Sequence, residues 1–159
     1  MEARRAAGII IFEGQSRSFL MGLRSDGQGW GFAAGKQEIG DVNLLDTALR
    51  ELREEFGVML SEIMQKQIRF HKTILCQYRH VDRYSKAVSR RTILSDIFYL
   101  EIDGKQQITI MPELMDKEMS TVRWFTLAEL AGDIEIFMPS LIALNTLNLD
   151  FKLLNNSDQ

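Results

Sequence analysis

Apolar residues near the start of the chain follow the pattern of two buried β-strands. Residues 6–12 form a short run rich in isoleucine, and residues 18–24 form a second run after a turn that contains Gly14. Short β-branched runs bounded by turn residues are typical of strands, and two of them across a short turn predict a hairpin. Residues 25–40 are rich in glycine, so we expect a loop there, anchored by the side chain of Trp30.

After Asn43 the spacing of apolar residues changes to that of an α-helix. Asn43 suits the N-cap of such a helix, and Gly57 suits the residue that ends it. Apolar side chains recur at helical spacing and fall on one arc, at Leu45, Ala48, Leu49, Leu52 and Phe56. We therefore expect one amphipathic helix whose apolar face packs against the core.

The second half of the chain alternates between strand and helix patterns. Apolar and β-branched residues predict further strands over residues 67–77, 92–102, 107–111 and 121–125. A basic loop separates the first two of these. Thr126 and Glu129 have the spacing of a capping box for a short helix, and a last helix is expected at about 139–147. Strands and helices in this order predict an α+β fold, with a sheet layered between helices.

Length, charge and cysteine content narrow the class of protein. The 159 residues fit a single domain, of which residues 148–159 are expected to form a flexible tail. The chain carries 19 basic and 22 acidic residues, so it lacks the positive field of a protein that coats nucleic acid. A single cysteine, Cys76, forms no internal disulfide, and the first apolar run is too short to span a membrane. A cytoplasmic protein is expected.

Three glutamates on the predicted helix are the first sign of chemistry. At about 100° per residue, Glu51, Glu54 and Glu55 share an arc roughly 100° wide that is turned away from the apolar face. Crowded carboxylates repel one another unless a cation neutralises them, and oxygen ligands of this kind suit Mg²⁺ or Mn²⁺. The same pattern also fits a solvated helix face with ion pairs such as Arg50 with Glu54. Both interpretations remain open on this spacing alone.

The residues around these glutamates carry a recognisable motif. The run from Arg50 to Val58 reads Arg-Glu-Leu-x-Glu-Glu-x-Gly-Val, and a glycine-rich segment precedes it. This run resembles the second half of the signature of the Nudix (MutT-like) hydrolases, G-x5-E-x7-R-E-U-x-E-E-x-G-U, where U is a bulky aliphatic residue. Residues 5–12, 20–24 and 122–125 are also similar to strands of that family, so the resemblance covers most of the chain.

The first half of the motif departs from the family pattern. Gly35 is followed by Asp41 where the family has glutamate, and eight residues rather than seven separate Asp41 from Arg50. Because the expected N-cap, Asn43, lies after Asp41, we place the additional residue in the loop before the helix. The three glutamates then keep their register, and the role of Asp41 stays open.

The resemblance implies both a fold and a metal-dependent activity. The fold would be an α/β/α sandwich with a mixed β-sheet, in which the signature forms a loop, a helix and a loop at the site. Members of the family hydrolyse a pyrophosphate bond in a nucleoside diphosphate linked to a group X, using Mg²⁺ or Mn²⁺ and an activated water. By this resemblance the metal ligands are Glu51, Glu54 and Glu55, joined by a backbone carbonyl of Ala34 or Gly35.

The same resemblance indicates which residues take part in the chemistry. Arg50 would orient a signature glutamate. The base that activates water would be either Glu54 or an acid of a later loop, where Glu118 is the candidate, with Glu113 and Asp116 behind it. A solvated acidic loop is the alternative interpretation of that later segment.

Basic residues outside the signature are candidates for binding the substrate. Arg24 and Lys36 would reach phosphate groups, and Arg83 in the basic loop would meet the distal part of the ligand. A solvated loop is the alternative interpretation of the basic segment. The substrate would be a nucleoside triphosphate, a nucleotide sugar or a dinucleoside polyphosphate. Two further expectations follow from the family: a homodimer is one expected assembly, and a nucleotide-binding or regulatory module without catalysis is the alternative function.

Overall fold

The secondary structure is described for residues 3–147 in a computed structural model, so the expected tail, residues 148–159, lies outside the described residues. The strands are β1 (Arg4–Glu13), β2 (Ser18–Arg24), β3 (Trp30–Gly31), β4 (Ala33–Lys36), β5 (Arg69–Val81), β6 (Val88–Ile102) and β7 (Met119–Thr126). The helices are α1 (Leu44–Phe56), α2 (Glu62–Gln65), α3 (Leu127–Leu130) and α4 (Met138–Asn145), with 3₁₀ turns η1 (Lys105–Gln107) and η2 (Pro112–Leu114).

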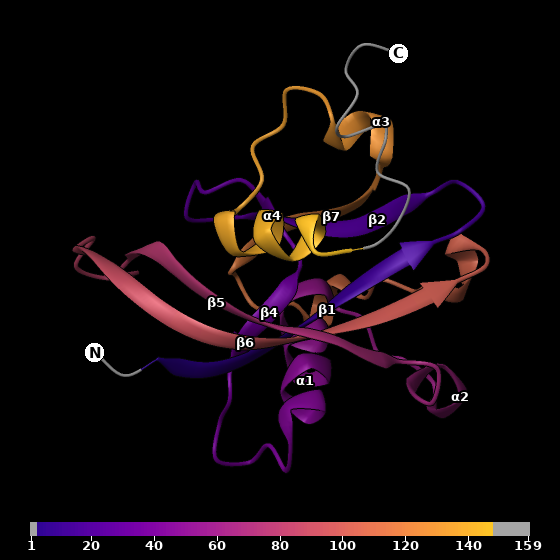
Figure 1. Cartoon of the computed structure of the whole chain (residues 1–159), viewed down its shortest axis with the longest axis horizontal. Helices are drawn as coiled ribbons and strands as arrows, with labels where there is room; N and C mark the ends of the chain where they lie inside the picture. Colours follow the sequence, from indigo (N-terminus) through magenta and orange to yellow (C-terminus); the bar gives the residue numbers. More distant parts are fainter. Residues whose placement is uncertain (1–2, 148–159) are drawn as a thin grey trace.

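Strand β1 lies at the centre of a mixed sheet (Figure 1). It pairs in parallel with β6 along its whole length and antiparallel with β4 over residues 6–9. At its end it pairs antiparallel with β2, which confirms the expected hairpin. Strand β5 continues the sheet beyond β6, while β3 and β7 pair with β2. The first half of β1 therefore lies between β4 on one side and the β5–β6 hairpin on the other.

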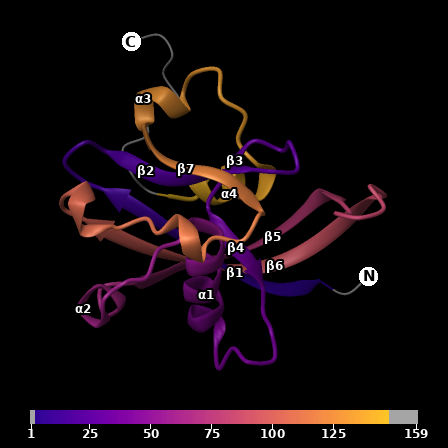
Figure 2. The same ribbon diagram turned by 180° about the vertical axis from the view of Figure 1, so that it is seen from behind.

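Alternate residues of β1 contribute to two cores on opposite faces of the sheet. Ile9 and Ile11 pack on the same side as Leu52 of α1, whereas Ile10 and Phe12 pack on the same side as Leu144 of α4. Figures 1 and 2 show α1 on one face of the sheet and α3 and α4 on the other. The first apolar run therefore forms a strand buried on both faces, as its pattern predicts. The sandwich of helices around a mixed sheet is confirmed.

Helix α1 begins and ends where its sequence signals lie. The side chain of Asn43 accepts a hydrogen bond from the backbone N–H of Asp46 at 2.9 Å, which satisfies one of the free donors of the first turn. Gly57 ends the helix with φ +67°, and its N–H donates to the carbonyl of Arg53 at 2.9 Å. A Cβ atom on Gly57 would lie 2.2 Å from the carbonyl oxygen of Met111, so both conformation and space require glycine there.

The glycine-rich segment 25–40 contains two short strands in addition to turns, so the expectation of a loop is wrong for part of it. Strand β3 pairs with β2, and β4 pairs with β1. Strand β4 has the sequence Ala-Ala-Gly-Lys, which lacks the β-branched residues that mark a strand. Its place is set by close approach to β1, because a Cβ on Gly8 would lie 2.8 Å from the Cβ of Ala34. Trp30 is partly buried and packs against Phe125, as an anchoring residue would.

Strands β5 and β6 continue through most of the segment expected to be a basic loop. Their pairing extends to Val81 opposite Val88, which leaves only residues 82–87 as a turn. Asp82 closes this turn, since its carboxylate accepts hydrogen bonds from the backbone N–H groups of Tyr84 and Ser85 at 3.0 and 2.7 Å. Charged residues occupy strand positions here because one side of each strand faces solvent.

The strand expected over residues 107–111 is absent. The 3₁₀ turn η1 leads into this segment, and Ile108 and Ile110 pack partly buried against the core beside α1. The N–H of Met111 donates to the carbonyl of Gly57 at 2.8 Å, so the backbone is held by the end of α1 instead of by the sheet. The apolar residues that resembled a strand thus cover the end of a helix.

The last helices follow the expected signals. In α3, the Thr126 hydroxyl accepts from the N–H of Glu129 at 3.2 Å and the Glu129 carboxylate accepts from the N–H of Thr126 at 3.1 Å, a reciprocal capping box. Helix α4 has Pro139 in its first turn and covers most of the expected range. Within residues 3–147, no helix has both the length and the apolar character that crossing a membrane requires.

Candidate active site

A stripe of polar residues on α1 is buried against the sheet. Thr47, Glu51 and Glu55 follow one another at four-residue intervals, and none is more than 7% exposed. The expected separation of the glutamates from the apolar face is therefore wrong for Glu51 and Glu55. The reason is that α1 packs against both β1 and β4, so two neighbouring stripes of the helix are covered instead of one.

Glu55 is the most deeply buried acid of the signature. It is 1% exposed, and its Oε1 accepts a hydrogen bond from the backbone N–H of Ala34 at 2.8 Å. Burial raises the pKa of Glu55 well above its ordinary value, and the nearby charge of Glu51 raises it further. A single backbone donor does not replace the solvation that a carboxylate loses on burial, so this group favours a cation beside it.

Glu51 lies against the backbone of Gly35, at the mouth of a cavity. A Cβ atom on Gly35 would lie 2.1 Å from Oε1 of Glu51, so the carboxylate occupies the space that a side chain would fill. Burial raises the pKa of Glu51 to about 7, although the Arg50 guanidinium acts in the opposite direction. Gly35 thus leaves space for the Glu51 carboxylate next to β4, where Arg50 only partly offsets the cost of burying it.

Arg50 joins the loop before α1 to the signature glutamates. Its Nη1 donates to Oε1 of Glu51 at 2.9 Å and to Oε2 of Glu54 at 3.1 Å. The rest of the guanidinium group holds both oxygens of Asp41 and the carbonyl of Lys36. These contacts hold the guanidinium in one orientation, as the role expected for Arg50 requires.

Glu54 and Glu118 are the more exposed acids at this place. The side chain of Glu54 is 42% exposed, and both residues line the cavity. Two backbone hydrogen bonds hold the loop of Glu118 over α1: the N–H of Asp116 donates to the carbonyl of Glu54 at 2.7 Å, and the N–H of Ser25 donates to the carbonyl of Glu118 at 2.8 Å. The charge of Glu118 raises the pKa of both Glu51 and Glu55, so the three carboxylates share one electrostatic environment.

The chemistry of these donors fits a hard divalent cation. Among residues 3–147, no three acidic, histidine or cysteine side chains already stand together as a complete metal cage. The available donors are nevertheless carboxylate oxygens, two of them on the buried side chains of Glu51 and Glu55, whose pKa values are raised by burial and by neighbouring carboxylates. A divalent cation beside Glu51 and Glu55 would offset that repulsion, and carboxylate oxygens suit ions such as Mg²⁺ and Mn²⁺.

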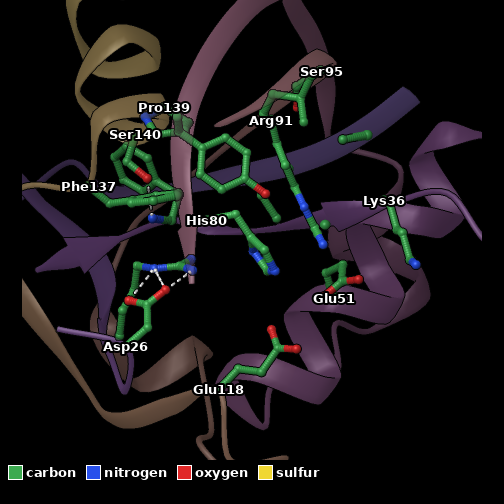
Figure 3. A pocket seen from close by; sticks show the side chains of 18 of the residues that line it. Asp26, Lys36, Glu51, His80, Arg91, Ser95, Glu118, Phe137, Pro139 and Ser140 are labelled. Atoms are coloured by element: carbon green, nitrogen blue, oxygen red, sulfur yellow. Dashed lines mark hydrogen bonds and ion pairs between the residues drawn. The ribbon is translucent and has the colours of Figure 1, made fainter. Parts of the chain in front are cut away.

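A cavity of about 670 Å³ opens beside the carboxylates (Figure 3). It extends from α1 and β4 to the β5–β6 hairpin and α4. The cavity brings together most of the residues expected from the sequence, namely Arg24, Ala34, Gly35, Lys36, Glu51, Glu54, Arg83 and Glu118. Glu55 is not on its wall, although its carboxylate accepts the hydrogen bond from Ala34, which is. Glu113 and Asp116 are not on its wall either.

Arg24 lies on the cavity wall, but its charge is engaged within the protein. Its guanidinium forms an ion pair with Asp26 at 2.6 Å and stacks over the ring of Phe137 at 3.9 Å. We therefore expect Arg24 to shape the wall more than to bind phosphate. Lys36 lies beside α1, with its side chain exposed at the cavity edge (Figure 3).

Several cavity residues were not expected from the sequence. Tyr78 and His80 of β5 and Arg91 of β6 face the cavity, and the ring of Phe137 packs edge-on against Tyr78 at 5.4 Å. The sequence contained one signal for them, because Tyr78 and His80 alternate with the polar residues Gln77 and Arg79 as strand positions do. The many charged residues around them in the sequence favoured the prediction of a loop instead.

Comparison with known proteins gives the family. A family model described as the NUDIX domain matches residues 2–144. A comparison with curated protein sequences gave no match.

Solved structures share the fold. A bifunctional NMN adenylyltransferase/ADP ribose pyrophosphatase from Francisella tularensis, complexed with AMP and Mn ion, aligns with 91% of this chain at 16% identity and a TM-score of 0.62. This chain spans only 40% of that protein. A NUDIX hydrolase from Alicyclobacillus acidocaldarius aligns with 91% of this chain and 90% of its own, at 14% identity and a TM-score of 0.60.

A third structure, the dihydroneopterin triphosphate pyrophosphohydrolase of E. coli, aligns with 82% of this chain and 87% of its own, at 19% identity and a TM-score of 0.55. Identities this low show a common fold and nothing finer. The family match covers most of the chain, and the signature helix α1 packs against β4 with Glu51 and Glu54 on the cavity wall. The chain therefore belongs to the Nudix family.

Proposed function

We propose that this protein hydrolyses a pyrophosphate bond in a nucleoside diphosphate linked to a group X, with the help of a divalent cation. The observation that carries the proposal is that Glu51 and Glu118 line a cavity large enough for a nucleotide, and that both influence the pKa of Glu55, which is buried next to Ala34 of the same wall. Carboxylates whose charge is not offset by internal partners suit a phosphate-containing substrate that binds together with a divalent cation.

The cation would be held by Glu51, Glu54 and Glu55, with a carbonyl of Ala34 or Gly35 as a backbone ligand. When bound, it would neutralise charge on the pyrophosphate and lower the pKa of a coordinated water. The protein orients the carboxylates that would bind the cation. Because Arg50 hydrogen-bonds to both Glu51 and Glu54, it would keep the two carboxylates directed to the same point.

We assign the water-activating base to Glu118 and leave Glu54 as a ligand. Glu54 accepts a hydrogen bond from Arg50 at 3.1 Å, which holds the carboxylate in place as a metal ligand requires. Glu118 forms no ion pair within residues 3–147, lines the cavity and stands on a loop fixed at both ends. Its carboxylate would take the proton from the attacking water.

Lys36 and Arg83 would bind phosphate oxygens from opposite sides of the cavity. Both line it, and neither side chain forms an ion pair within the described residues. Two of the similar structures are a bifunctional NMN adenylyltransferase/ADP ribose pyrophosphatase complexed with AMP and a dihydroneopterin triphosphate pyrophosphohydrolase, and this similarity supports a nucleotide-like substrate here. Nucleoside triphosphates, nucleotide sugars and dinucleoside polyphosphates are the compounds to test.

The test is a substrate panel with Mg²⁺, with Mn²⁺ and with chelator. Released phosphate, pyrophosphate and nucleoside monophosphate are separated, because the products identify the phosphorus that is attacked. We expect metal-dependent release of a nucleoside monophosphate from at least one compound. Tight binding of a nucleotide without turnover under any metal condition would instead favour a regulatory module.

A further inference from the structure

One part of the cavity wall is built by three adjacent strands of the sheet. Arg4 comes from β1, Arg91 from β6 and His80 from β5, in the order in which these strands lie in the sheet. The register places Arg4 opposite Ile93, two residues from Arg91, and His80 opposite Ser89 on the other side of β6. The three side chains lie on one face of the sheet and line the same cavity.

The guanidinium groups of Arg4 and Arg91, on this part of the wall, form no ion pair within the described residues. Within residues 3–147, Arg5, Arg24, Arg50 and Arg123 each form an ion pair, whereas neither Arg4 nor Arg91 does. Figure 3 shows Arg91 reaching from its strand into the cavity, near His80. An arginine that projects into a cavity without a carboxylate partner is suited to bind an oxyanion of a ligand.

The charges of Arg91 and Arg4 act on the imidazole of His80. Burial lowers its pKa below the ordinary value, and Arg91 and Arg4 lower it further, while Asp82 and Asp26 act in the opposite direction. The imidazole therefore favours its neutral form at neutral pH, in which one ring nitrogen donates a hydrogen bond. It would add a donor to those of the guanidinium groups.

We propose that Arg91, Arg4 and His80 form a second anion subsite, which binds a phosphate carried by the X group of the substrate. The inference rests on the proposed function of the cavity. The carboxylates that would take the scissile pyrophosphate with its metal come from α1 and the loop before β7, whereas these cations come from strands of the sheet, and we assign them to another anion. A neutral X group would leave the two guanidinium groups uncompensated. The preferred substrate is thus a nucleoside diphosphate linked to a phosphorylated group.

The aromatic wall beside the subsite would strengthen such binding. Tyr78 lies opposite Arg91 in the register of β5 and β6, and its ring packs against Phe137. Charges interact more strongly next to apolar groups that exclude water. A phosphate at Arg91 would therefore be held more tightly than one at an exposed arginine on the outside of the hairpin.

The hairpin offers a matched control for Arg91. Arg90 precedes it on β6, is exposed and does not line the cavity, because successive strand residues point to opposite faces. Arg91→Gln and Arg90→Gln remove the same charge from the same strand. Only the first change reaches the proposed subsite.

The first experiment follows the two histidines of the chain by NMR in metal-free protein, with inorganic phosphate as the probe. A bound anion favours the imidazolium, so phosphate is expected to raise the pKa of His80 in wild type and in Arg90→Gln. The rise should be lost in Arg91→Gln. His71, which hydrogen-bonds to Thr146 at 3.0 Å and is not on the cavity wall, serves as the internal reference. Equal responses of both histidines, or none, would overturn the subsite.

The second experiment compares a nucleoside diphosphate sugar with the same compound phosphorylated on the far side of its sugar. In Arg91→Gln, kcat/KM for the phosphorylated compound should fall by about tenfold or more, as expected for a lost charged hydrogen bond. The rate for the unphosphorylated compound should stay close to that of wild type, and Arg90→Gln should change neither. An equal loss for both compounds would place Arg91 at the scissile pyrophosphate and overturn the proposal.

The two experiments separate this inference from the function on which it rests. A phosphate-dependent shift of His80 without hydrolysis of any compound would support the subsite and contradict the proposed hydrolase activity. Hydrolysis without preference for the phosphorylated compound would support the activity and contradict the subsite.

Discussion

Arg50 donates two parallel hydrogen bonds to Asp41, from Nε to Oδ1 and from Nη2 to Oδ2, each 3.0 Å long. This fork explains the aspartate that replaces a glutamate in the signature. The hydrogen bonds from Arg50 hold the pKa of Asp41 well below its usual range, and those from Glu38 and Thr47 add to the effect. Asp41 thus acts as the group that fixes Arg50.

Replacing Arg50 by lysine should therefore damage both the loop and the site. Lysine cannot form the planar fork, so Asp41 would lose its bidentate partner, and Glu51 and Glu54 would lose their common donor. We expect Arg50→Lys to lower kcat by about 10- to 100-fold and the free energy of unfolding by about 1–3 kcal/mol. Steady-state kinetics and chemical denaturation measure these effects.

Arg53→Lys is the control for this change. Arg53 lies on the same helix, is exposed and is not on the cavity wall. It should retain wild-type kinetics and stability. An Arg50→Lys variant that also retained both would show that the fork does not orient the glutamates.

Gly35 provides a test of how closely Glu51 must approach β4. In Gly35→Ala the new Cβ would lie 2.1 Å from Oε1 of Glu51, so the carboxylate must move. Because displacements of about 1 Å at a reacting site can cost about a hundredfold in rate, a loss of that order in kcat is expected. Gly40→Ala is the control, since no atom lies within 4 Å of a Cβ there. Similar kinetics in the two variants would contradict the role of this contact.

Local signals explain which parts of the fold could be predicted. The cap at Asn43, the apolar period of α1 and the left-handed residue Gly57 are all encoded within one segment, and the structure agrees with each of them. The burial of Glu55 depends on β4, whose own position depends on β1 about thirty residues earlier in the chain. No periodicity within α1 contains that information.

Prediction of the cavity from the sequence meets the same limit. Its acidic end could be predicted because the signature brings its residues together within one loop and helix. The part of the wall that the sheet builds requires the parallel pairing of β1 with β6 and the antiparallel return to β5, which join Arg4, Arg91 and His80 across long sequence separations. Charge density along residues 79–91 favoured a solvated loop, whereas the strand register turns alternate residues inward.

Glu118 and Glu54 can be distinguished by their effects on the pH profile. If Glu118 is the base, Glu118→Gln should lower kcat by about 10²- to 10⁴-fold and remove the acidic limb of the pH–rate profile. Glu54→Gln should also lower kcat by orders of magnitude, but should keep that limb and raise the Mg²⁺ concentration needed for activity. Circular dichroism should show both variants folded. The reverse pattern of pH dependence would make Glu54 the base.

Glu55 should govern the stabilisation of the protein by metal. In the absence of metal its buried carboxylate is poorly compensated, so Glu55→Gln should unfold at the same temperature as wild type or higher. Mg²⁺ at a hundredfold excess over its Kd should stabilise wild type by about 3 kcal/mol, and this gain should be largely lost in Glu55→Gln.

Calorimetry with and without chelator measures the effect of Glu55. Glu62→Gln, on the exposed face of α2, is the control and should keep the full gain. If Mg²⁺ stabilised Glu55→Gln as much as wild type, Glu55 would not be a metal ligand.

Glu13 should make the stability of the fold sensitive to acid. Its buried carboxylate accepts hydrogen bonds from the N–H groups of Gln15, Ser16 and Gly104 and from the Ser16 hydroxyl, which joins the turn after β1 to the end of β6. These bonds lower the pKa of Glu13 to about 2 from an ordinary value of 4.5. The stability that the carboxylate contributes is therefore complete above pH 4.5 and is lost as the pH falls toward 2.

Urea denaturation across this range tests the linkage. Glu13→Gln should be less stable than wild type at neutral pH, and the two unfolding free energies should converge as the pH falls from 4.5 to 2. Glu113→Gln, at an exposed position, should run parallel to wild type. A constant difference between Glu13→Gln and wild type throughout this range would mean that Glu13 stabilises the turn by its shape alone, since its charge would then contribute nothing.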